Sequence, residues 1–235
     1  MKFRRKKKHI EFKPDKPEDY YRGILHNITE EESEIIDQIR NLQIARLRKT
    51  YQDYFENPEY TQISKYFFER VYGGEDKTSR DAAFNKIYEK LSAAVNEKRI
   101  VRVSQLKQLN ELTDELDLQM ARLWVQKKNQ PSMTLVDFEN CYREMNERSK
   151  RELQLQLLME TTRFFHRLSH IPFIGFVIKP TQFAARALGV EYVMDFFLDG
   201  YKSFKSVKNA EPFMQAIQER EWAYMEKVFN SENAL

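Results

Sequence analysis

Apolar residues recur every three to four positions along most of the chain, which is the spacing of one face of an α-helix. The pattern first becomes clear after Thr29. Thr29 and Glu32 have the spacing of a capping box, in which each side chain satisfies a free backbone N–H group of the other residue. Apolar residues follow at helical spacing, at Ile35, Ile36 and Ile39. We therefore predict that the first helix begins next to Thr29.

The segment from Asn57 to Tyr72 is apolar around most of its circumference when it is drawn as a helix. Asn57 is suited to cap this helix, and Pro58 is suited to its first position. Gly73 and Gly74 follow, as glycine commonly does at a helix C-terminus. The pattern predicts a helix that is buried at the centre of the fold.

Further helices are predicted at the remaining segments with helical spacing, which begin near residues 79, 104, 134, 180, 190 and 211. The segment from Thr134 to Ser169 has a polar middle, residues 146–152, so it is either exposed there or divided into two helices. We expect residues 29–230 to form one all-α, bundle-like domain of seven to nine helices without a strand. The chain has only 6 Gly and 7 Pro, too few for the many turns of a sandwich or barrel.

The first 28 residues lack apolar periodicity and contain Pro14, Pro17 and Gly23, so we predict a basic, partly disordered N-terminal arm at residues 1–28. Positive charge is concentrated at its start, in six residues with no acid among them: Lys2, Arg4, Arg5, Lys6, Lys7 and Lys8. Removing these six charges from the net charge of +3 leaves the rest of the chain at −3. Such a segment either attracts nucleic-acid phosphates or an anionic membrane surface, or is a solvated tail.

Cys141 is the single cysteine, which excludes an intramolecular disulfide bond and favours a reducing compartment. We expect it to be a small buried apolar residue, not a reactive thiol. The most apolar segment, Ile171 to Ile178, is far shorter than the ~20 residues needed to cross a bilayer, and no secretory signal is visible. The sequence therefore predicts a soluble, cytoplasmic protein without a transmembrane segment.

Two aromatic segments carry a resemblance to a known family: residues 66–73, YFFERVYG, and residues 196–204, FFLDGYKSF. Shorter matches accompany them at residues 79–81, 115–117, 142–143 and 217–221. In order and spacing these segments resemble the bacterial FFLEELY-motif proteins from about residue 40 to residue 228, although Arg-Val stands where that family often has Glu-Leu or Asp-Leu. Because that family is uncharacterised, the resemblance implies an all-helical bacterial protein and no activity.

His166 and His170 stand four residues apart on one face of a predicted helix and are the weak candidates for a metal site. A di-iron bundle needs Glu-x-x-His motifs, which the chain lacks, and a zincin needs Glu where Arg167 stands. Glycine-rich nucleotide loops, nucleophile elbows and Cys-x-x-Cys pairs are absent as well. We therefore predict no metal and no cofactor, with both histidines satisfied internally or lying at the surface.

Eight charged residues are expected to form an internal polar network that fixes the register of the helices: Glu69, Arg80, Asp81, Asp114, Asp117, Arg143, Arg220 and Glu221. Glu69 lies on the nearly all-apolar helix. It is either a catalytic acid with a raised pKa or, in the favoured interpretation, part of a buried ion pair with Lys65 or Arg80. Arg220 is expected to pair with Asp114 or Asp117.

These observations favour a non-enzymatic binding or scaffolding module with a basic arm for an anionic partner. The partner is expected to be another protein, or a nucleic acid or anionic membrane surface bound through residues 2–8. The alternative is a helical metal- or haem-dependent enzyme, similar to haem oxygenases, that is centred on His166 and Glu69.

Overall fold

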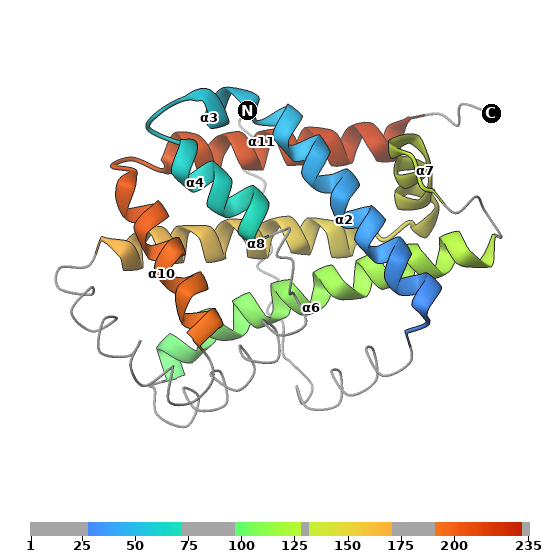
Figure 1. Cartoon of the computed structure of the whole chain (residues 1–235), viewed down its shortest axis with the longest axis horizontal. Helices are drawn as coiled ribbons and strands as arrows, with labels where there is room; N and C mark the ends of the chain where they lie inside the picture. Colours follow the sequence, from blue (N-terminus) through green and yellow to red (C-terminus); the bar gives the residue numbers. More distant parts are fainter. Residues whose placement is uncertain (1–27, 72–96, 128–131, 171–190, 232–235) are drawn as a thin grey trace, which may run out of the picture.

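The computed structural model describes residues 28–71, 97–127, 132–170 and 191–231. Over these residues the chain forms helices and no strand, which confirms the predicted all-α class (Figure 1). In chain order the elements are α2 (Glu30–Thr50), α3 (Gln52–Glu56), α4 (Thr61–Lys65), η1 (Tyr66–Val71), α6 (Glu97–Gln126), α7 (Leu135–Met145), α8 (Arg148–Ser169), α10 (Glu191–Ser206) and α11 (Glu211–Asn230). η1 is a π-helix and the others are α-helices. The predicted arm lies outside the described residues, except for its last residue.

Four long helices, α2, α6, α8 and α11, make up most of the described structure (Figure 1). α8 is central, because it packs against α6, α10 and α11. α2 crosses α6, while α4 and η1 lie against α10. α7 packs on both α6 and α11 at the end of the molecule opposite α10 (Figure 1).

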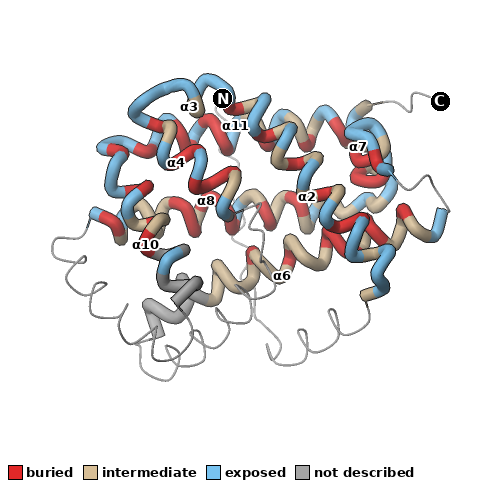
Figure 2. The backbone as a smooth tube through the Cα atoms, viewed as in Figure 1, coloured by how far each residue is buried: buried red, intermediate tan, exposed pale blue. Residues whose placement is uncertain are grey.

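The interior contains two groups of buried apolar residues. The first surrounds η1 and is rich in aromatic rings: Tyr51 stacks on Phe68 with 4.4 Å between the ring centroids, and Phe213 meets Phe68 edge-on at 5.8 Å. The second lies between α2, α6, α7 and α11 and includes Ile39 and Met120. Figure 2 shows buried residues alternating with exposed ones along the helices. Three consecutive aromatic residues at the start of η1 are buried, as the prediction of a central segment requires.

Two capping boxes begin helices where the sequence predicts a start. The Thr29 N–H group donates to Glu32 Oε2 at 2.8 Å, and the Glu32 N–H group donates to Thr29 Oγ1 at 3.1 Å. Thr134 and Asp137 form the same reciprocal arrangement at the start of α7. Both starts are therefore fixed by side chains that are close in sequence.

The segment from Thr134 to Ser169 is divided into two helices. α7 ends at Met145, α8 begins at Arg148, and Asn146 between them has a left-handed φ of 50°. Asparagine tolerates this region better than most residues, because its short polar side chain bonds locally. The polar middle of the segment therefore marks a helix break and not an exposed stretch of one helix.

The helix predicted from Asn57 begins later than expected. Residues 57–60 form a turn, and α4 begins only at Thr61. The Asn57 side chain accepts a hydrogen bond from the Glu59 N–H group at 3.0 Å, and the Thr61 hydroxyl donates to the Asn57 carbonyl at 2.8 Å. Asn57 thus organises the turn before the helix instead of capping the helix itself. η1 then continues directly from α4 as a π-helix.

The helix predicted near residue 104 begins earlier than expected, because α6 starts at Glu97. The predicted helix end at Gly73 and Gly74 and the helices predicted near residues 79 and 180 lie outside the described residues. Among the helices that the structure describes, none is long and apolar enough to cross a membrane.

Candidate functional site

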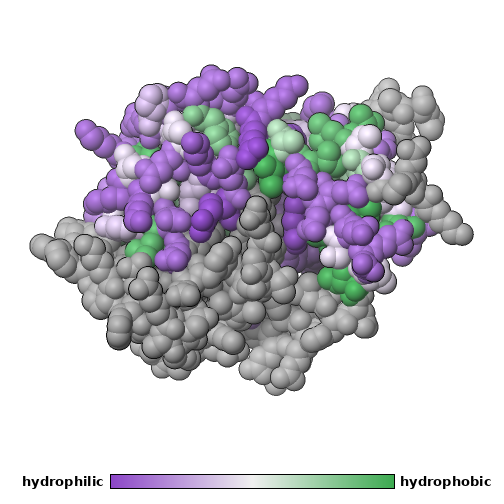
Figure 3. Space-filling model, viewed as in Figure 1, coloured by the Kyte–Doolittle hydropathy of each residue, from purple (hydrophilic) through white to green (hydrophobic). Residues whose placement is uncertain are grey.

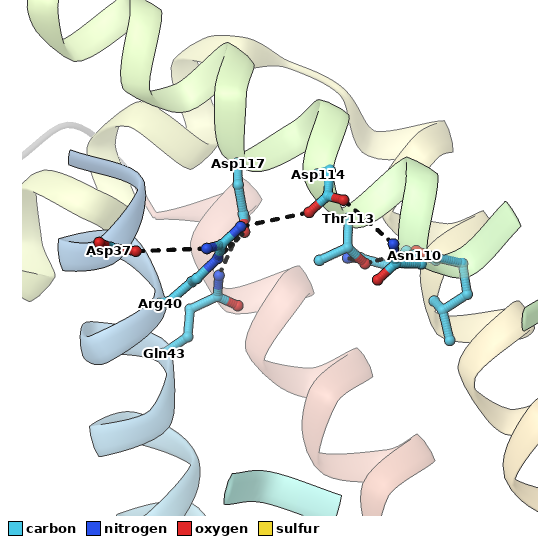
Figure 4. A network of polar contacts seen from close by, with 9 residues as sticks. Asp37, Arg40, Gln43, Asn110, Thr113, Asp114 and Asp117 are labelled. Carbon is cyan, nitrogen blue, oxygen red and sulfur yellow. Dashed lines mark hydrogen bonds and ion pairs between the residues drawn. The ribbon is translucent and has the colours of Figure 1, made fainter. Parts of the chain in front are cut away.

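Arg40 on α2 holds two aspartates of α6, and these three residues form the first polar cluster (Figure 4). Its guanidinium lies 3.6 Å from Asp114 Oδ1 and 3.7 Å from Asp117 Oδ2. Asp117 is only 2% exposed and also accepts a hydrogen bond from the Gln43 amide at 3.5 Å. The expected pairing of these aspartates with Arg220 is therefore wrong, because α2 and not α11 lies against this part of α6.

Glu221 on α11 is the centre of a second cluster. The Arg46 guanidinium binds both of its carboxylate oxygens, at 3.1 and 2.6 Å, and the Tyr51 hydroxyl donates to it at 2.9 Å. The Arg46 guanidinium also lies 4.0 Å from the centroid of the Tyr224 ring. Burial, and then the negative charge of Glu221, raise the pKa of Tyr51 far above its usual value, so this hydroxyl stays protonated and remains a donor. The cluster fixes the position of α2 on α11.

Arg220, next to Glu221 in the sequence, points toward the surface. It binds both carboxylate oxygens of Asp53 on α3, at 2.8 and 2.7 Å, and donates to the Thr50 carbonyl at 2.7 Å. The hydrogen bond from Arg220 lowers the pKa of Asp53, more than burial raises it. Of the pair Arg220 and Glu221, the glutamate is the one that enters the interior.

Arg143, another member of the predicted network, forms its contacts at a different place. Arg143 on α7 donates to the Val228 carbonyl of α11 at 2.9 Å and to Asn140 Oδ1 at 3.2 Å. Arg80 and Asp81 lie outside the described residues. The described members of the predicted network contribute to contacts between pairs of helices, such as α2 with α6 and α7 with α11.

Arg151, which the sequence analysis missed, is the most buried arginine among the described residues at 5% exposure. Its guanidinium lies 4.4 Å from the centroid of the Tyr142 ring and donates to Gln154 Oε1 at 3.1 Å. No carboxylate of the described chain lies within ion-pair distance of it. The only sequence feature that could have indicated a buried Arg151 is its position in the polar segment 146–152. That segment is equally consistent with a solvent-exposed stretch of helix.

The two candidate metal ligands lie at the C-terminal end of α8, with His166 in its last turn and His170 at its C-cap. The ring centroids of His166 and His170 are 4.5 Å apart, and His170 Nδ1 lies 3.0 Å from the His166 carbonyl oxygen. Burial, and then the neighbouring His170, lower the pKa of His166. Within the described part of the chain, no three His, Cys, Asp or Glu side chains are grouped closely enough to hold a metal ion.

Cys141 on α7 is a free, buried cysteine, as predicted. Burial is the main reason that its thiol pKa rises to about 11, so the thiol is protonated and a poor nucleophile near neutral pH.

The structure brings η1 and α10 together around an open cleft of about 290 Å³. Its lining combines charged and neutral polar groups with one aromatic ring: Gln62, Lys65, Tyr66, Glu69, Arg70, Asp199 and Ser203. Tyr66 approaches the α10 backbone so closely that a Cβ atom on Gly200 would lie 2.5 Å from the tyrosine hydroxyl oxygen. Glycine at position 200 therefore permits the close packing that forms one wall of the cleft.

Two ion pairs flank the cleft. Glu69 on η1 pairs with Arg48 of α2 at 3.0 Å, and Arg70 on η1 pairs with Asp199 of α10 at 3.3 Å. Glu69 is 35% exposed, so the expectation of a buried pair with Lys65 is wrong in both its partner and its burial. Since the π-helix turns through more residues than an α-helix, the four-residue spacing between Lys65 and Glu69 does not bring their charges together.

Comparison with known families comes down to one match. Residues 24–235 match a family that is described as a domain of unknown function, DUF8198. The chain belongs to the DUF8198 family. No curated protein and no solved structure shows a significant match to it.

The DUF8198 match includes every described helix, the two polar clusters and the cleft between η1 and α10. The six cations of the arm lie before residue 24 and are therefore outside the matched region. The family match therefore covers the described helices but not the basic segment.

Proposed function

We propose that this DUF8198 protein is a non-enzymatic binding module that attaches to an anionic partner through Lys2, Arg4, Arg5, Lys6, Lys7 and Lys8. The observation that carries the proposal is the separation of charge along the chain. These six cations have no acidic residue among them, whereas the rest of the chain has a net charge of −3. The residues 29–230, which we call the body, supply a folded platform for the arm.

The polar clusters support a model in which the arm binds the partner and the charges inside the body stabilise its fold. The deeply placed carboxylates Asp117 and Glu221 are each bound by an arginine of α2, so their charge serves contacts between helices. On the face shown in Figure 3, hydrophilic residues dominate the described surface and hydrophobic residues occur in small groups. Attachment through charge is therefore better supported than attachment through a broad apolar surface.

The alternative of a metal- or haem-dependent enzyme has less support. Glu69 is engaged in an ion pair with Arg48 at 3.0 Å, so its carboxylate contributes to the contact between η1 and α2. His166 has His170 as its neighbour on the same helix, and no carboxylate or cysteine completes a metal-binding group within the described residues. We therefore favour the binding module, together with a cytoplasmic location, which rests on the single buried cysteine.

The proposal is tested by replacing all six arm cations with glutamine in the full-length chain. Binding is measured to three polyanions of different classes: duplex DNA, vesicles containing phosphatidylserine, and polyglutamate. We expect the unmodified chain to bind at least one of them, and the arm variant to bind it at least about tenfold more weakly.

The matched control replaces four exposed body lysines, Lys49, Lys202, Lys205 and Lys208, with glutamine. This variant should bind almost as well as the unmodified chain, because these lysines lie on α2 and at or just after the end of α10, outside the basic segment. Equal loss in both variants, or no binding of any probe by the unmodified chain, contradicts the proposal. Circular dichroism confirms that each variant is folded.

A further inference from the structure

We infer that the cleft between η1 and α10 is a binding site for a small oxyanion, a molecule that carries a carboxylate or phosphate group. This inference uses residues of the body and is independent of the arm. The volume of about 290 Å³ is near the lower end of the range for ligand pockets, which is ~300–1,000 Å³, so a small molecule fits it better than a long chain does.

The shape of the cleft is built into the backbone. η1 is a π-helix, a form that widens the helix locally and occurs frequently at functional sites. Its first residue, Tyr66, packs directly on Gly200, which holds η1 and α10 together along one side of the cleft. The pair between Arg70 and Asp199 connects the same two elements at 3.3 Å. Two independent contacts therefore hold the walls in place without a ligand.

The charge around the cleft favours an anion. Both of its carboxylates are already neutralised, Glu69 by Arg48 and Asp199 by Arg70. Lys65 forms no ion pair within the described residues, so its ammonium group is the charge left without a counterion. An incoming anion meets an uncompensated cation and two carboxylates whose repulsion is reduced by their arginine partners.

The neutral groups of the cleft complete the recognition of an oxyanion. Ser203 lines the cleft although it is only 3% exposed. Its hydroxyl forms no hydrogen bond with any described residue. The Gln62 amide also has no hydrogen-bond partner in the described structure. A hydroxyl, an amide and an ammonium group can all donate to the oxygens of a carboxylate or phosphate, and bonds to such charged acceptors are the stronger kind.

The test measures binding of inorganic phosphate and of succinate to the full-length chain by calorimetry, with NMR to locate the affected amides. We expect saturable one-to-one binding of at least one of the two anions, with shifts at residues 62–70 and 198–203. The comparison between phosphate and succinate tells which oxyanion the cleft prefers.

The Lys65→Gln variant should bind the preferred anion at least about tenfold more weakly than the unmodified chain does. Ser203→Ala should weaken binding by a smaller factor, because a neutral donor contributes less.

Lys205→Gln is the control, because Lys205 is an exposed lysine on the same helix as Ser203 and does not line the cleft. It should leave the affinity unchanged. The inference is overturned if Lys65→Gln and the unmodified chain bind both anions equally, or if neither anion gives saturable binding.

The arm variant separates this inference from the proposed function. With its six arm cations replaced by glutamine, the chain should still bind the anion in the cleft with unchanged affinity. Loss of small-anion binding in that variant would overturn the cleft site while leaving the arm proposal intact. If that variant still binds the small anion and also binds polyanions as strongly as the unmodified chain does, the arm proposal is overturned and the cleft site stays intact.

Discussion

The buried arginines show how differently the same residue type is accommodated at two positions. Arg46 binds both carboxylate oxygens of Glu221 and stacks on Tyr224. Arg151 is buried as deeply, but it meets an aromatic face and the neutral amide of Gln154. The free energy of unfolding should therefore fall strongly when the charge of Arg46 is removed and change little when that of Arg151 is removed, since only the first removal leaves a buried charge behind.

The first prediction compares Arg46→Met with Arg151→Met. Arg46→Met leaves the Glu221 carboxylate buried without its cation, and we expect a loss of about 3–5 kcal/mol in the free energy of unfolding. Arg151→Met leaves no unpaired carboxylate among the described residues, so the change should stay within about 1 kcal/mol of zero. Urea unfolding followed by circular dichroism measures both values. Similar losses in the two variants would contradict this view of the two sites.

The second prediction concerns pH and His166. Its pKa is lowered in the folded chain, by burial first and by His170 second. The unfolded chain therefore takes up this proton at a higher pH than the folded chain does. Stability should fall as the pH decreases from about 6.5, the unfolded pKa, through the lower folded value.

Unfolding by urea at about pH 7.5 and about pH 5.5 checks the pH prediction. His166→Gln removes the titrating group, so the variant should lose less stability over this interval than the unmodified chain. Glu211 is the acidic group whose charge acts on His166, and it is present in both chains. An identical loss in both chains would mean that His166 does not couple to folding.

At the scale of the helices, the sequence predicts starts well where one side chain decides them. The capping boxes at Thr29 and Thr134 involve residues only three positions apart, so their geometry is local. The π-helix is not predicted, because a segment with apolar side chains around most of its circumference fits helices of more than one period. The partners of Asp114 and Asp117 are not predicted either, since they depend on how α2 crosses α6.

Arg40 illustrates what the sequence does contain at this scale. It follows Ile36 by four residues and precedes Gln43 by three, which places it on the inner stripe of α2. A charged residue on that stripe signals a buried partner, but not which helix supplies it. The cleft was beyond prediction for the same reason, because η1 and α10 are more than a hundred residues apart in sequence.

The third prediction concerns the break between α7 and α8. Asn146 has a φ of 50°, a value that glycine adopts freely and that β-branched residues avoid. Asn146→Gly should change the free energy of unfolding by less than about 1 kcal/mol, whereas Asn146→Val should lower it by about 1–2 kcal/mol. Urea unfolding measures the free energy of unfolding of both variants. If valine is tolerated as well as glycine, the break does not depend on this backbone conformation.

At the scale of the whole molecule, the chain combines a helical DUF8198 domain with a basic segment outside the family match. The body uses its inward charges to join helices, as Arg40 and Arg46 show, and has an open cleft between η1 and α10. The resemblance of residues 66–73 to the FFLEELY motif stays a prediction. Part of that motif lies on η1, directly at the cleft.

The salt dependence of polyanion binding tests the central claim most directly. If the six arm cations neutralise phosphates of duplex DNA, the logarithm of the binding constant should fall linearly with the logarithm of salt concentration, with a slope of up to about −5. The account predicts a steep slope of this kind for the unmodified chain and a slope near zero for the variant with six glutamines. Equal slopes for the two chains would contradict it, because the binding charge would then lie in the body.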